Sequence, residues 1–412
     1  MRPHEASRVE EAQDDRTALL LALGRGLHQA GLSTDALEEV LHDVAVASGV
    51  ALQVNVLPTS LILAVGSGFA QRVQILRLEP GNVHLRKLAL LENVVDALRR
   101  GARAPGDALA DVMRIDTALQ PDPPVTTVLA YLLLAVGTAL LLGGFASDIA
   151  ASAVVGIAIG AIAAVSQRSR RANRVFEISA AFVATVIIAL WERFLGSLSL
   201  YVVLIAGIVP LLPGYSLTTA FSELANRNWV SGTARLGGVF VTLLSLACGF
   251  VLGSEVGGST IMTSATIGAS TVTAASTIGA GVLMALGIVL LLHARLRDVG
   301  WIVISALATI ALSRTFPPLG ITQAAPFVTA FAVGLGTNLA ARYLRIPRSV
   351  VLVPALLVLV PGSVSYESLL SVFQSDSTDA VSLLVRALLA AILIVAGFLT
   401  SQLLAPPPRR VG

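Results

Sequence analysis

The chain has 412 residues, of which 55% are hydrophobic and 13% charged, and its mean hydropathy is +0.82. Soluble globular domains carry about a quarter charged residues, so this composition excludes that class. The single cysteine, Cys248, excludes an intrachain disulfide and a cysteine-based metal cluster. Charge is concentrated at the start, because residues 1–122 hold 12 of the 28 Lys and Arg and 16 of the 25 Asp and Glu. The basic pI near 9.4 comes from arginines beside apolar segments, so we expect no nucleic-acid partner.

Residues 1–120 are predicted to form a small α+β domain, which we call the head. A stripe of leucines at helical spacing predicts a first helix over 15–30, which Gly31 ends. Further helices are predicted over 34–48, 88–101 and 106–119, and strands over 50–57, 61–65 and 73–78. The acidic N-terminus lacks the apolar core of a signal peptide, so we expect the head in the cytoplasm. The leucines of the stripe are Leu19, Leu20, Leu23 and Leu27.

Three head residues have side chains that bind metals in other proteins, namely His28, His42 and Asp43. The two histidines are not four residues apart, and no third ligand is evident. We therefore interpret all three as solvated positions on helix faces, and we expect neither a metal nor another cofactor. A stiff linker of sequence Pro-Asp-Pro-Pro, residues 121–124, leads out of the head.

Residues 125–405 are predicted to be an α-helical polytopic membrane body. A membrane span needs about 20 mostly apolar residues. Residues 256–277, rich in Ser, Thr and Gly, fit an outer loop, a re-entrant segment or the start of the sixth span equally well. The ten predicted spans, of which the fourth and ninth are short, are 125–145, 149–166, 176–191, 197–212, 234–253, 278–293, 299–314, 321–341, 349–361 and 383–404.

The placement of arginines predicts the orientation of these spans, since Lys and Arg favour cytoplasmic loops. With the head inside, only Arg193, Arg314 and Arg386 lie on outer segments, so both termini are expected in the cytoplasm. Five spans in each half, 125–255 and 256–405, give the halves opposite orientations, as two inverted repeats. The thirteen inner arginines are Arg168, Arg170, Arg171, Arg174, Arg227, Arg235, Arg295, Arg297, Arg342, Arg345, Arg348, Arg409 and Arg410.

A Pro-Gly break interrupts an apolar run once in each half. Gly214 and Gly362 are 148 residues apart, as are Gly249 and Gly397. Paired interruptions of this kind mark the binding sites of secondary transporters, because freed backbone groups survive in a membrane only beside protein or a watery cavity. The alternative is that each break ends a helix at the membrane surface. The substrate-binding candidates at the breaks are Pro213, Gly214, Tyr215, Ser216, Thr218, Thr219, Pro361, Gly362, Ser363 and Tyr366.

Carboxylates near these breaks are candidates for proton coupling, since a carboxylate beside a substrate cavity can hold a proton. Glu223 and Glu367 are the leading candidates for this role, and Glu177, at the inner end of the third span, is a weaker one. Asp148, in the first outer turn, is a weaker candidate, and Glu367 reads equally well as a solvated loop residue.

Arginines begin the fifth and tenth spans, at Arg235 and Arg386. We assign Arg235 to the carboxylate of a substrate, and snorkelling to the membrane interface is the alternative for both arginines. Gly214 and Gly362 are expected to adopt backbone dihedrals that a β-branched residue resists. Gly137, within the apolar run of the first span, is expected to tolerate a side chain.

Six stretches carry a resemblance: AGLSTDALE (30–38), VLPTS (56–60), VHLRKL (83–88), LPGYSLTTA (212–220), SGTARL (231–236) and VPGS (360–363). In this order and spacing they resemble the threonine/serine exporter family, ThrE, in the form that joins a cytoplasmic head to ten spans. The resemblance implies a proton-driven antiporter of threonine and serine in the lipid bilayer of a bacterial inner membrane. It allows a homo-oligomer. Related two-chain transporters are associated with dicarboxylates such as succinate.

Two other classes of protein compete with this interpretation. One is a membrane-anchored hydrolase, since the head of this family has been likened to a hydrolase, and the other is a passive channel. The sequence shows no Ser-His-Asp set, nucleophile elbow, zinc pattern or phosphate-cradling glycine loop. We therefore name no catalytic residue and predict that the protein is not an enzyme. A duplicated body with polar interruptions is also more than an anchor needs.

Overall fold

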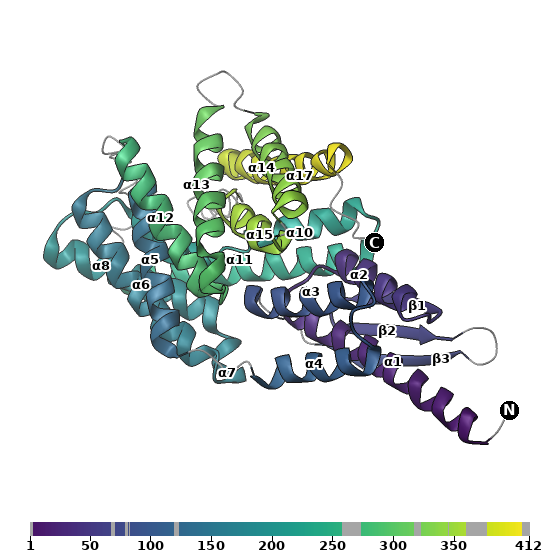
Figure 1. Ribbon diagram of the computed structural model, residues 1–412. Helices are drawn as coiled ribbons and strands as arrows, with labels where there is room; N and C mark the ends of the chain where they lie inside the picture. The colour runs from purple at the N-terminus through teal and green to yellow at the C-terminus, as the bar shows by residue number, and fades with distance from the viewer. Residues whose placement is uncertain are drawn as a thin grey trace.

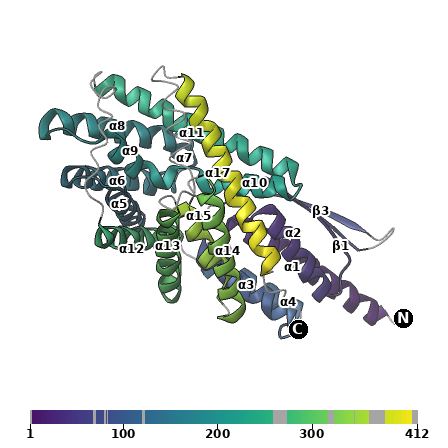
Figure 2. The same cartoon turned by 90° about the horizontal axis from the view of Figure 1, so that it is seen from above.

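The computed structural model describes residues 3–66, 71–78, 81, 83–118, 123–257, 273–316, 323–344, 346–359 and 377–405. Helices dominate these residues, and three short strands lie near the N-terminus. Figure 1 shows the head beside the longer helices of the body, and the strands project from the head at the end where the N-terminus lies. Seen from above in Figure 2, the head again lies toward the end of the molecule that carries the N-terminus.

The head has the α+β composition that the sequence predicts. Its helices are α1 (Pro3–Gln29), α2 (Thr34–Ala47), α3 (Leu85–Arg99) and α4 (Pro105–Ala118). Its strands β1 (Leu52–Leu57), β2 (Ser60–Val65) and β3 (Arg72–Arg77) form one antiparallel sheet in that order. The predicted elements are confirmed to within a few residues, except that α1 begins 12 residues before the predicted start at residue 15.

The leucine stripe of α1 forms the centre of the head's core. All four of its leucines are at most 1% exposed, and they share a cluster with Leu37 and Leu41 of α2 and with Leu61 and Leu63 of β2. Burying such a side chain fully stabilises a fold by roughly 1.5–3 kcal/mol, so this cluster accounts for the predicted helices. Gly31 follows α1 with a φ of +84°, the left-handed conformation that favours glycine at a helix end.

The interpretation of His28 as a solvated residue is wrong. His28 lies in the last turn of α1 and is only 5% exposed. Its imidazole is hydrogen-bonded to the carbonyls of Leu57 and Pro58 and lies near Arg235 of the body, and the periodicity of α1 reveals neither contact. His42 is exposed as expected, and Asp43 forms an ion pair with Arg99 at 2.6 Å.

A helix lies at each of the ten predicted span positions. Six are long and apolar enough to cross a membrane by length and composition, and the bent pair Leu200–Leu211 and Gly214–Ala225 makes a seventh if it counts as one span. Arg348–Leu359 and Leu388–Leu404 are shorter apolar helices. Ten spans therefore remain a prediction. The helices are α5 (Pro124–Leu141), α6 (Ala146–Ser166), α7 (Arg170–Asn173), α8 (Phe176–Leu195), α9 (Leu200–Ile208), α10 (Gly214–Ala225), α11 (Trp229–Gly257), α12 (Ala274–Leu291), α13 (Val299–Thr315), α14 (Ala325–Tyr343), α15 (Arg348–Leu359) and α17 (Ser377–Leu404).

Corresponding helices of the two halves pack in corresponding ways. In each half the last helix lies along the third, as α11 lies along α8 and α17 along α14. Gly249 of α11 approaches the backbone of α8 so closely that a Cβ atom would collide with it, and Gly397 of α17 does the same to α14. The residues approached are Ile178, Ala181 and Phe182 in α8, and Phe327, Ala330 and Phe331 in α14.

The glycine contacts also give the directions of the helices. One turn further along, Gly253 of α11 meets Thr185 of α8, so both helices advance together and are parallel. Between α5 and α12 the order is reversed: Gly137 lies against Ala280 and Met284, whereas Gly287 lies against Ala130 and Leu134. The first helices of the two halves therefore run antiparallel.

The expectation that Gly137 tolerates a side chain is wrong. A Cβ atom there would lie 2.9 Å from the backbone nitrogen of Met284 and 3.0 Å from the carbonyl oxygen of Ala280. Gly137 permits the close approach of α5 and α12, and a single sequence does not show which helix face meets another helix.

Candidate functional site

The first Pro-Gly break is a bend inside the apolar core. The helix α9 tightens into one 3-10 turn, Val209–Leu211, and α10 then begins at Gly214, bent by 55° from the preceding segment. Pro213 precedes α10 and, lacking an N–H group, cannot extend the ladder of the previous helix. Gly214 is helical and has no positive φ, so the expectation of unusual dihedrals at this glycine is wrong.

The hydroxyl groups that follow the break are bonded within α10. Thr218 donates its Oγ1 hydrogen to the carbonyl oxygen of Gly214 at 3.2 Å, and Thr219 donates to that of Tyr215 at 2.8 Å. Ser216 and Tyr215 are half-buried. These residues lie on the first two turns of one helix, as the sequence predicts for a local cluster.

Tyr215 brings the first break next to the second half of the chain. Its side chain packs against apolar clusters that contain Val350 and Val353 on one side and Ala355 and Leu356 on the other. All four belong to α15, which directly precedes the second break. The predicted site residues Pro361, Gly362, Ser363, Tyr366 and Glu367 lie outside the described residues.

The candidate carboxylate Glu223 forms a buried ion pair with the candidate arginine. Glu223, on the last turn of α10, is 0% exposed. Arg235 of α11 donates from Nε to Oε2 at 3.0 Å and from Nη2 to Oε1 at 2.9 Å. This two-pronged geometry is the strong form of an arginine–carboxylate contact. The structure thus brings together two residues that the sequence selected for different roles.

The head donates two further hydrogen bonds to the same carboxylate. At the start of α2, Thr34 donates its backbone N–H to Oε1 of Glu223 at 3.3 Å and its hydroxyl hydrogen at 3.0 Å. Thr34 is itself 0% exposed. Sequence reasoning missed this contact because it joins residues 189 apart in the chain, for which no local pattern exists.

His28 borders this cluster from α1. Burial lowers the pKa of His28, the nearby charge of Arg235 lowers it further, and hydrogen bonds to the carbonyls of Leu57 and Pro58 partly offset both. Its Nδ1 atom is buried and has no hydrogen-bond partner within the described residues. His28 is therefore favoured in its neutral form at the junction between head and body.

The other charged candidates lie apart from this cluster. Glu177 is half-buried on the first turn of α8, where its charge acts on the buried Tyr131 of α5. Asp148 caps α6 and accepts hydrogen bonds from the backbone N–H groups of Phe145 and Ser199, which is a structural role. Arg386 is exposed on α17.

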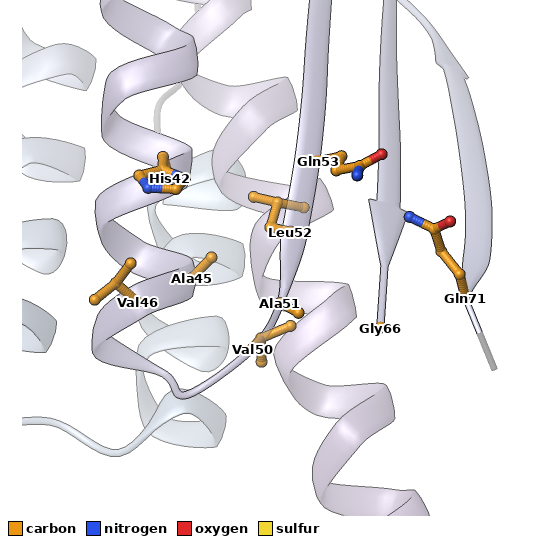
Figure 3. A pocket seen from close by; sticks show the side chains of 9 residues that line it. All are labelled: His42, Ala45, Val46, Val50, Ala51, Leu52, Gln53, Gly66 and Gln71. Carbon is orange, nitrogen blue, oxygen red and sulfur yellow. The ribbon is translucent and has the colours of Figure 1, made fainter. Parts of the chain in front are cut away.

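A pocket of about 470 Å³ lies inside the head, between the second half of α2 and the sheet. Figure 3 shows that its polar side chains are His42, Gln53 and Gln71, and the others around them are apolar. Glutamine neither titrates nor attacks a substrate, so His42 alone could act as an acid or base among the lining residues. Throughout the described ranges, no three His, Cys, Asp or Glu side chains gather closely enough to hold a metal ion.

Several helices long and apolar enough to cross a membrane, together with one broken helix, are features found in membrane transporters. A family model described as "Putative threonine/serine exporter" matches residues 18–257, and a second, described as "Threonine/Serine exporter, ThrE", matches residues 276–404. The chain therefore belongs to the threonine/serine exporter family, a family of membrane exporters, and the resemblance drawn from its motifs is confirmed.

Two curated relatives are yeast proteins, each named pheromone-regulated membrane protein 10. The protein of Zygosaccharomyces rouxii is 27% identical over 376 residues, which cover 87% of this chain and 38% of that protein. The protein of Kluyveromyces lactis is 27% identical over 252 residues, which cover 59% of this chain and 26% of that protein. The chain thus spans well under half the length of these relatives. No solved structure matches it.

Proposed function

We propose that the protein is a secondary active exporter of threonine and serine, driven by the proton gradient across a bacterial cytoplasmic membrane. The observation that carries the proposal is the bend of 55° at Pro213-Gly214, buried against the helix that leads to the equivalent Pro-Gly step. A broken helix packed against the helix that leads to a matching Pro-Gly step fits the setting of a transporter's substrate site. The hydroxyls and amides of Gly214 to Thr219, together with Gly362 and Ser363, suit a zwitterionic, hydroxylated substrate.

The directions of the helices support an inverted repeat. The helices α5 and α12, first in their halves, run antiparallel. Because α8 and α11 are parallel, the chain between them must return over the length of a helix, which favours a broken span over a re-entrant loop for α9 and α10. The same holds for α14 and α17, between which α15 and the second break must return the chain. Both observations favour ten crossings.

The position of the head supports its cytoplasmic orientation. The head contacts the body through Asn226, Leu292 and Ser349, each next to a segment whose arginines predict an inner location. The face of the body that carries these three connections is therefore the arginine-rich one, and a head bound there belongs in the cytoplasm.

The ion pair suggests how a proton and a substrate could exchange. A substrate from the cytoplasm replaces this ion pair, with its ammonium on Glu223 and its carboxylate on Arg235. A proton that reaches Glu223 from outside displaces the ammonium and releases the substrate there. Loss of that proton to the cytoplasm restores the ion pair, so the proton moves inward as the substrate moves outward. In this scheme Glu223 is the coupling group, and Glu367 and Glu177 are further candidates for proton transfer.

The proposal is tested by export of labelled threonine, serine and succinate from loaded cells, with the proton gradient intact and collapsed. We expect gradient-dependent export of the two amino acids, whereas export of succinate alone would replace the substrate class. Glu223→Gln is expected to keep threonine binding but to lose the dependence on the gradient, because an amide takes up no proton. Glu255→Gln, at an exposed end of α11, is the matched control and should export normally. Normal gradient dependence of Glu223→Gln would exclude Glu223 as the coupling group.

A further inference from the structure

The start of α2 in the head contacts elements from both halves of the body. On the side of the first half, Thr34 binds Glu223, and Asp35 accepts a hydrogen bond from Nδ2 of Asn226 at 2.7 Å. Both partners belong to the end of α10, the helix that begins at the first break. The head is therefore bonded directly to the helix that follows that break.

On the side of the second half, the partner is α15, the helix that leads to the second break. Its first residue, Arg348, interacts electrostatically with Glu39 and Asp35 of α2. Its second residue, Ser349, donates its hydroxyl hydrogen to Oε1 of Glu92 in α3 at 3.2 Å. Asp35 thus lies between Asn226 of one half and Arg348 of the other.

The contact between α2 and the second half leaves more buried polar atoms without hydrogen-bond partners than the contact with the first half. Oδ1 of Asp35 and Nε of Arg348 are both buried and lack a hydrogen-bond partner among the described residues. Glu223, by contrast, accepts four hydrogen bonds, two of them from Thr34. The polar contact with α15 is therefore the one that leaves buried atoms without a hydrogen-bond partner.

An apolar contact adds to these polar ones. Leu85, at the start of α3, is 1% exposed and shares a cluster with Ile302 and Val350 of the body. Its backbone N–H donates to the carbonyl oxygen of Leu292 at 2.8 Å. The head is thus packed against the body as well as hydrogen-bonded to it.

We propose that the head is the cytoplasmic gate of the transporter: α2 and α3 tie the two break-bearing helices together and must release α15 for the inner side to open. The inference rests on the proposed function, since alternating access requires the two halves to move relative to each other. A domain bound to both halves on one face prevents that movement until one contact breaks. The head stays on α10 through Glu223 and separates from α15.

The test is a reversible crosslink between head and second half. Glu92→Cys and Ser349→Cys, in a Cys248→Ser background, are joined by a short thiol crosslinker that a reductant cleaves. We expect export of labelled threonine to fall at least tenfold when the crosslink forms and to recover when it is cleaved. The matched control joins Asp43→Cys to Arg99→Cys within the head, where the ion pair spans 2.6 Å, and should leave export unchanged.

A second measurement does not depend on export. Ser216→Cys, one turn into α10, is labelled with a thiol reagent applied from the side of the head, with and without the Glu92–Ser349 crosslink. If the head is a gate, the crosslink should slow thiol labelling of the Ser216→Cys variant at least tenfold. Unchanged labelling and unchanged export would overturn the gate. Absence of export in the uncrosslinked protein, with labelling still slowed, would overturn the proposed function and leave the gate standing.

Discussion

At the scale of single residues, Glu223 has the carboxylate with the most hydrogen bonds among the described residues of the predicted site. A carboxylate that is 0% exposed is stable as an anion only if charged or polar partners replace its water, and here Arg235 and Thr34 do so. Sequence reasoning could identify both charges, because carboxylates and arginines are rare within membrane segments and usually serve function. It could not pair them, since residues 12 apart on two helices meet only after the turn between α10 and α11 has formed.

The buried ion pair predicts that replacing one partner destabilises the protein more than replacing both. Arg235→Met leaves Glu223 buried without its charge partner, which typically costs about 3–5 kcal/mol. We expect a lower thermal midpoint and less folded protein in the membrane. Adding Glu223→Leu should restore the midpoint, because an apolar pair of similar volume needs no solvation, but should not restore export. Full recovery of export in the double variant would show that the pair is only structural.

His28 predicts a dependence of stability on pH. Burial first, and the charge of Arg235 second, hold the pKa of His28 below its ordinary value of 6.5, and the charge of Glu223 opposes them only in part. A group whose pKa is lower in the folded state stabilises the fold above the unfolded pKa and loses that contribution as the pH falls. The thermal midpoint should therefore fall between about pH 7 and pH 5, and His28→Gln should flatten this part of the profile. Identical slopes for both proteins would contradict the prediction.

At the scale of elements, hydrophobic periodicity and the positions of glycine and proline predicted most of the secondary structure. The leucine stripe of α1 and the glycine after it gave the end of that helix but not its start, and the strand predicted over 61–65 matches β2 to within one residue. No membrane span was predicted over α10, because the hydroxyl-rich sequence that follows Pro213 is too short and too polar to cross a membrane alone. Helix faces were also beyond reach, since the close contacts of Gly137 and Gly249 depend on which helices become neighbours.

The break itself predicts a transport defect without a folding defect. Gly214 is buried at the first turn of α10, beside Tyr215 and the helix α15. Gly214→Val places a β-branched side chain there, so threonine export should be lost while the protein reaches the membrane at near-normal abundance. Gly238→Val in α11 is the control, because nothing lies within 4 Å of a Cβ atom at that position. Export by Gly214→Val at the wild-type rate would mean that the bend is an ordinary helix end.

At the scale of the whole molecule, two independent features agree on the topology. The arginine distribution assigns the segments around Arg227, Arg295 and Arg348 to one side of the membrane. The head, whose position owes nothing to that rule, contacts the body at the same three segments. The sequence alone predicts the arginine-rich side of the body and a separate head. It does not predict that the head contacts the body on that side, because this depends on how the head packs on the body.

The last prediction follows from that agreement and from the helix directions. The parallel course of α8 and α11 and the antiparallel course of α5 and α12 favour five crossings in each half, in opposite senses. A reporter fused after Gln167 should then be cytoplasmic, on the side of the head, and one fused after Ser375 should be external. An external signal after Gln167 would place the arginine-rich face outside and contradict the orientation. A cytoplasmic signal after Ser375 would mean that the second half does not cross the membrane at α15, and the two halves would then not be inverted copies.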